Sequence, residues 1–189
     1  MTASPENSVL KSFLDVIRTD TLPHLGPEVR GGLRSASELE SAVEGFCETH
    51  SLSHAQADLL KSAALLWHDD LDASHTLSQD IKTSDGSFLH GIMHRREPDS
   101  SNAKYWFRLV GDHSSFKALA AAVQSLGESK NQQHVTEPLV ASGTWDPFAF
   151  VDACSRAMQG NRDSATYTLL QEIQELELQH LLSDILAGR

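Results

Sequence analysis

Apolar residues recur at helical spacing along nearly the whole chain, and the alternation that is typical of strands is scarce. This pattern predicts an all-α fold, because residues three and four positions apart share one face of a helix. A helix is expected to begin after Ser53, a good cap residue, and to continue to about Ile81 as the long central helix of a bundle. A second long helix is expected from about Asp163 to Leu186. The chain is thus predicted to form one helical domain, residues 1–189.

Proline and glycine mark the segments that connect the expected helices. Residues 22–37 hold two prolines and three glycines and are expected to be irregular. A helix with a capping box is expected to begin near Ser37. A short helix is expected over residues 87–97, because Pro98 disfavours helical geometry in the residue before it. Residues 127–144 are polar and lack periodicity, so they are expected to form a surface loop.

Two consecutive helices are predicted to carry polar groups, mostly imidazole and carboxyl, at the spacing of one helix face. On the 54–81 helix these positions are His68, Asp72, His75 and Gln79. On the 87–97 helix they are His90, His94 and Glu97. Because only a short turn joins the two helices, they can pack antiparallel with these faces toward each other. A polar pocket is therefore expected between them.

Imidazole nitrogens and carboxylate oxygens suit zinc, iron or manganese, and helical bundles build metal centres from such groups on facing helices. The predicted ligands of a divalent metal are His68, Asp72, His75, His90, His94 and Glu97. Alternatively, the same six residues form a metal-free acid/base set, in which a carboxylate orients an imidazole. The predicted catalytic residues are His75, Asp72 and His94. In a third interpretation His68 and His75 are hydrogen-bonded residues in the core or at its boundary, and the aspartates cap helices or face water. The Glu-x-x-His repeat of di-iron bundles and the His-Glu-x-x-His motif of zinc proteases are absent, so neither mechanism is carried over.

The segment "HRREPDSSNAKYWFRLV", residues 94–110, is basic within a chain whose formal net charge is −11. A guanidinium fork binds a carboxylate or a phosphate, so a small anionic substrate is expected to bind here beside the histidines. The predicted substrate-binding residues are Arg95, Arg96, Lys104, Tyr105 and Arg108. Which of Arg95 and Arg96 faces the pocket stays open, because adjacent helical residues diverge by about 100°. Alternatively, the arginines tie the bundle together by pairing with aspartates of the preceding helix, which are Asp69, Asp70 and Asp72.

The acidic composition narrows the classes of partner. A net charge of −11 and a sequence pI near 5.2 weigh against nucleic acids and anionic membranes, which need a basic face. No apolar stretch approaches the roughly 20 residues of a membrane span, and the start "MTASPENSVLKSF" resembles neither a secretory nor a transit signal. Cys47 and Cys154 lie in apolar helical patterns, where reduced, packed thiols are expected. A cytoplasmic location is predicted.

Three blocks of the sequence carry a resemblance. The blocks "WHDDLDASHTLSQ", "LHGIMHRREPDSSNAKYWFRLVGDH" and "WDPFAFVDAC" resemble a family of uncharacterised bacterial and fungal proteins that share them. The resemblance covers about residues 65–113 and 145–154, roughly a third of the chain. No activity is attached to these blocks, so the resemblance implies no catalytic residue.

The expected C-terminal helix carries a wide apolar stripe, which is expected either to join the core or to bury against a second copy in a homodimer. The stripe consists of Leu169, Leu170, Ile173, Leu176, Leu181, Ile185 and Leu186. The leading interpretation of the whole chain is a small cytoplasmic enzyme, with or without a divalent metal, that acts on a small anionic molecule. The alternative is a non-catalytic helical interaction protein whose charged blocks are structural ion pairs.

Overall fold

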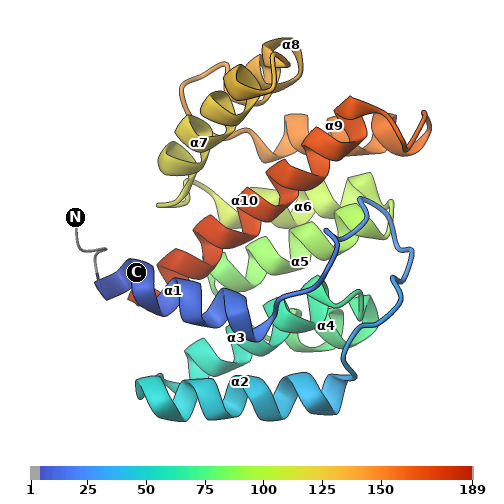
Figure 1. The fold of residues 1–189 in the computed structure, drawn as a ribbon. Coiled ribbons are helices and arrows are strands. Elements are labelled where there is room, and N and C mark those ends of the chain that lie inside the picture. Colours follow the sequence, from blue (N-terminus) through green and yellow to red (C-terminus); the bar gives the residue numbers. More distant parts are fainter. Residues whose placement is uncertain (1–4, 189) are drawn as a thin grey trace.

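The computed structural model describes residues 5–188, and all of the regular structure within them is helical (Figure 1). The predicted all-α fold is confirmed. The helices are α1 (Pro5–Val16), α2 (Ala36–His50), α3 (His54–Trp67), α4 (Leu71–Ser78), α5 (Ser84–Arg96), α6 (Ser100–Val110), α7 (Phe116–Ser129), α8 (Gln133–Thr136), the 3-10 helix η1 (Glu137–Leu139), α9 (Pro147–Met158) and α10 (Ala165–Ala187). Every helix within residues 5–188 is too short or too polar to cross a membrane.

Helix α10 crosses the middle of the molecule, and α1, α3, α7 and α9 pack against it (Figure 1). It begins after Ser164, whose side chain accepts a hydrogen bond from the Tyr167 N–H, close to the predicted start. Most of its apolar stripe is buried in the chain's own core, while Leu176 and Leu186 are partly buried. The stripe therefore joins the core, and the homodimer stays a prediction.

Local capping accounts for several helix boundaries. Ser53 caps α3 in a capping box with Gln56, as the sequence predicts, and Asp146 caps α9. Helix α2 begins slightly earlier than expected, because its capping box is formed by Ser35 and Glu38. These caps bind backbone N–H groups that have no partner within the helix.

The prediction of a single long helix over residues 54–81 is wrong, because the helix is interrupted between α3 and α4. Asp69 adopts a left-handed backbone conformation with φ 62°, which aspartate tolerates better than most residues. Asp70 then caps α4 by accepting a hydrogen bond from the Ala73 N–H. The break turns the Asp69 side chain into the protein, and it separates His68 from the face that carries His75.

The prediction of a surface loop over residues 127–144 is wrong in part, since this segment contains the short helices α8 and η1. Thr136 is buried and packs directly on Gly127, where a Cβ atom would overlap the threonine side chain. Leu139 of η1 is also buried. The segment is therefore packed onto the end of α7, although its sequence has no apolar period.

Candidate metal centre

Three histidines from two neighbouring helices converge at one point. His90 and His94 lie one turn apart on α5, so both side chains leave the same face of that helix. His75 reaches them from α4, and its ring meets theirs edge-on, with centroid separations of 4.7 Å to His90 and 5.3 Å to His94. One nitrogen of each ring lies within 4.8 Å of the others. These three residues, named the histidine cluster from here on, could hold a metal ion.

The hydrogen bonds of the cluster place two nitrogen atoms face to face. The Nε2 atoms of His90 and His94 are 2.9 Å apart. The outer nitrogen of His94, Nδ1, lies 3.0 Å from Oε2 of Glu97, and Nδ1 of His90 lies 3.4 Å from Oγ of Ser78. Histidines that bind metals are oriented in this way, with one ring nitrogen toward the ion and the other held by an oxygen atom.

Burial keeps the imidazoles of α5 in the neutral form that binds metals. His90 is 1% exposed, and the ring of Trp106 stacks on it with centroids 3.8 Å apart. Burial, with the neighbouring His94 and His75, lowers the pKa of His90 to about 4. Burial also lowers the pKa of His94, although Glu97 opposes that shift. At neutral pH His90 is therefore uncharged, and one of its ring nitrogens carries a free lone pair.

Two residues at this site are partly exposed to solvent. His75 is half-buried, and the side chain of Glu97 is 34% exposed. Three histidines supply three of the four ligands of a tetrahedral metal ion, which leaves one position for water or a substrate. His75 and Glu97 are therefore residues of the site that solvent can reach.

Three predicted ligands, His68, Asp72 and Glu97, lie outside the cluster. His68 is a buried residue at the end of α3, where its Nδ1 accepts from the Arg34 N–H and its Nε2 contacts the Ile17 carbonyl at 3.1 Å. Burial lowers the pKa of His68 as well. Asp72 is exposed in the first turn of α4, where it lines a cavity of about 530 Å³ that Glu97 also lines. His68 thus fits the interpretation of a hydrogen-bonded core histidine, whereas Glu97 contacts His94 but does not belong to the group that could hold an ion.

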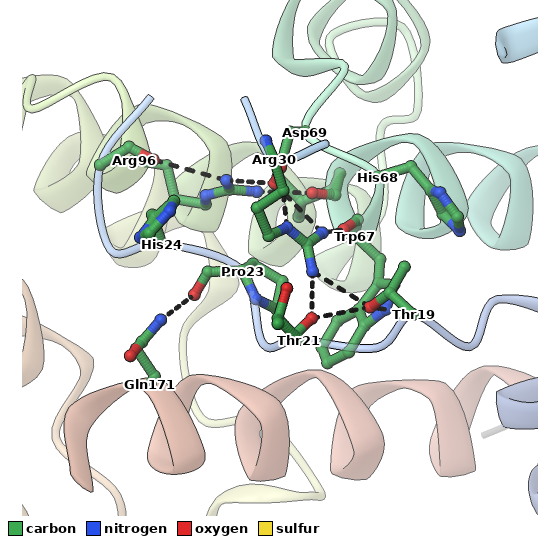
Figure 2. A network of polar contacts seen from close by, with 12 residues as sticks. Thr19, Thr21, Pro23, His24, Arg30, Trp67, His68, Asp69, Arg96 and Gln171 are labelled. Atoms are coloured by element: carbon green, nitrogen blue, oxygen red, sulfur yellow. Dashed lines mark hydrogen bonds and ion pairs between the residues drawn. The ribbon is translucent and has the colours of Figure 1, made fainter. Parts of the chain in front are cut away.

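The guanidinium of Arg96, predicted to bind a substrate, is bound by other residues of the protein. Its Nη2 lies 2.7 Å from Oδ1 of Asp69, and its Nη1 donates to the Leu66 carbonyl. Asp69 also accepts from Nε of Arg30 at 2.8 Å, so one carboxylate lies between two buried guanidinium groups (Figure 2). This contact is the Arg96–aspartate pairing of the structural alternative, and it holds the break between α3 and α4 against α5.

Arg95 is buried in a second ion pair. Both terminal nitrogens of its guanidinium bind the two carboxylate oxygens of Glu177 on α10, at 3.0 and 2.6 Å. The guanidinium also lies over the ring of Phe150, 4.3 Å from its centroid. Sequence reasoning missed Glu177, although a signal was present: it lies between Ile173 and Leu181 on the apolar stripe. A carboxylate in such a stripe needs a buried cation.

The remaining predicted substrate-binding residues lie on α6. Lys104 pairs with Asp152 of α9 at 2.6 Å, while Tyr105 and Arg108 are exposed. The α6 residue that contacts the histidine cluster is Trp106, which the sequence analysis did not include in the site. Ser78 was missed too, because a serine near a helix end carries no signal of a histidine partner.

Comparisons of this chain with protein families, with curated proteins and with solved structures found no match.

Proposed function

We propose that this protein is a metalloenzyme that binds one divalent transition-metal ion through His75, His90 and His94. The convergence of three imidazole nitrogens within 4.8 Å of one another carries the proposal. Two of them already face each other at 2.9 Å, a separation that an ion between them would widen only modestly. Their outer nitrogens are held by oxygen atoms, which supports a ligand role for both rings.

The donor set suits zinc better than manganese. All three ligands are imidazole nitrogens, whereas manganese prefers carboxylate and carbonyl oxygens. Structural zinc sites use four protein ligands, and catalytic ones use three and keep a position open. Three histidines at the edge of the core match the catalytic pattern. In that arrangement zinc lowers the pKa of a bound water and supplies a nucleophile at neutral pH, as hydrolytic enzymes require.

The proposed substrate is a small molecule that approaches the cluster past His75 and Glu97, which are partly exposed. We propose an anionic substrate, as the sequence predicts, although fewer of the predicted basic residues are free to bind it. Arg95 and Arg96 already bind carboxylates of the protein, which leaves Arg108 and Tyr105 of α6 exposed to solvent. Tyr105 contacts Trp106 edge-on, with ring centroids 5.6 Å apart, and Trp106 in turn stacks on His90.

A second candidate function is a non-catalytic helical interaction protein. The buried pairs of Arg95 with Glu177 and of Arg96 with Asp69 favour it, because they account for much of the basic segment without a substrate. In this candidate the histidine cluster is a hydrogen-bonded part of the core. The two candidates differ in whether the protein takes up a metal.

Metal content separates these candidates. Protein purified without a histidine tag is analysed for bound elements and then titrated with zinc after chelator treatment. The proposal predicts one zinc ion per chain in the wild type, its loss in His75→Ala, and its retention in His68→Ala, which removes a histidine outside the cluster. Absence of zinc binding in the wild type would overturn the proposal and leave the interaction protein and the metal-free acid/base site as the alternatives.

A further inference from the structure

The contact between Glu97 and His94 assigns the proton on the His94 ring. An ionised carboxylate only accepts hydrogen bonds, so the proton of a neutral His94 lies on Nδ1, which donates to Glu97 over 3.0 Å. Nε2 of His94 then carries a lone pair. This lone pair points at His90, whose Nε2 is 2.9 Å away. Glu97 therefore holds His94 in the tautomer that a metal requires.

His90 has a partner that can reverse its role. The hydroxyl of Ser78 lies 3.4 Å from Nδ1 of His90 and 3.3 Å from the backbone carbonyl of His75. A hydroxyl both donates and accepts, so Ser78 can donate to His90 in one orientation. In the other orientation it donates to the His75 carbonyl and accepts from His90. A carboxylate at this position could not make that exchange.

These contacts give two arrangements of protons. Without a metal, the lone pair on Nε2 of His94 needs a donor, so His90 carries its proton on Nε2 and accepts from the Ser78 hydroxyl at Nδ1. With a metal, both Nε2 lone pairs point at the ion, and the proton of His90 must lie on Nδ1. One proton leaves Nε2 for water and one is taken from water at Nδ1, so the ring stays neutral and no net proton is released.

We propose that Glu97 and Ser78 are positioning residues of the metal centre, a proposal that rests on metal binding by the histidine cluster. Glu97 keeps His94 in one tautomer throughout. Ser78 turns its hydroxyl when the metal binds, and His90 changes tautomer with it. His94 thus keeps its tautomer while His90 changes, so the two imidazoles can lie close together both with and without the ion.

Zinc affinity tests the role of Glu97. Loss of a carboxylate that holds a ligating histidine lowers metal affinity by about 10- to 100-fold, and we expect this for Glu97→Ala. Glu97→Gln keeps an acceptor oxygen, so we expect it to restore part of the loss. Asp72→Ala is the matched control, because Asp72 lines the same cavity as Glu97 but is exposed and does not contact the cluster. An equal loss of affinity in Glu97→Ala and Asp72→Ala would show a general charge effect and would overturn the positioning role.

Ring tautomers test the whole arrangement directly. Proton–nitrogen NMR correlations of ¹⁵N-labelled histidine rings are recorded before and after zinc, with assignments from single histidine variants. We expect His94 to carry its proton on Nδ1 in both states and His90 to change from Nε2 to Nδ1. In Ser78→Ala the metal-free tautomer of His90 loses its donor, so zinc should cause a smaller change. Zinc binding with His94 protonated at Nε2, or without a change at His90, would overturn this inference alone, whereas a wild type that binds no zinc would overturn the proposed function as well.

Discussion

Replacement of Asp69 by asparagine should destabilise the protein strongly, because this carboxylate holds two buried guanidinium groups. Its side chain is fully buried, and it accepts from the Arg30 N–H at 2.9 Å, from Nε of Arg30 at 2.8 Å and from Nη2 of Arg96 at 2.7 Å. Asparagine has nearly the same shape and tolerates the left-handed conformation, so the backbone should contribute little. The change removes the charge and leaves both arginines without a full partner.

The expected loss is about 3–5 kcal/mol in the free energy of unfolding, the usual cost of breaking a buried ion pair from one side. For a domain of this size that corresponds to a fall of roughly 6–20 °C in Tm. The measurement is urea unfolding at pH 7, monitored by the circular dichroism signal of the helices. Asp70→Asn is the matched control, because asparagine caps a helix as well as aspartate does, and we expect it to change stability by less than about 0.5 kcal/mol. An Asp69→Asn protein within about 1 kcal/mol of the wild type would refute the account of this network.

Three further predictions address other parts of the molecule. In metal-free protein, the free energy of unfolding should fall by about 3 kcal/mol as pH drops from 6.5 to 4. The reason is that His90 takes up a proton in the unfolded chain over this range, whereas folded His90 has a pKa of about 4. Urea midpoints across this range measure the loss, and His90→Gln should make them depend less on pH. Glu177→Gln should cost about 3–5 kcal/mol by leaving Arg95 unpaired while zinc affinity stays unchanged, and a large loss of zinc affinity in a folded variant would contradict the separation of these two sites. Copper(II) should quench tryptophan fluorescence mainly through Trp106, which stacks on His90, so Trp106→Phe should lose most of the quenching; equal quenching in both proteins would place the metal elsewhere.

The helical class and several helix ends could be predicted because they depend on neighbouring residues. Ser53 and Asp146 cap their helices through N–H groups two or three positions away, and such contacts are visible in the spacing of the sequence. The pair His90 and His94 follows from the same rule, since residues four apart share a helix face. Each of these features is local, so no knowledge of the tertiary structure was needed.

The break at Asp69 could not be predicted, because its cause lies in distant parts of the chain. The apolar period continues across the break, and only the buried guanidiniums of Arg30 and Arg96 make a turned-in carboxylate stable there. The break also decides the site, since it separates His68 from His75. Trp106 and Ser78 reach the cluster through packing between helices, which spacing along one helix does not reveal.

The central claim is that the histidine cluster binds a metal ion, and crystals soaked in zinc test it most directly. Diffraction data collected on both sides of the zinc absorption edge locate the ion without assumptions about its ligands. The account predicts one strong anomalous peak per chain, about 2.0–2.1 Å from a nitrogen atom of each of His75, His90 and His94, with a fourth position open to solvent. Zinc found only at surface carboxylates, with Nε2 of His90 and Nε2 of His94 still hydrogen-bonded to each other, would contradict it.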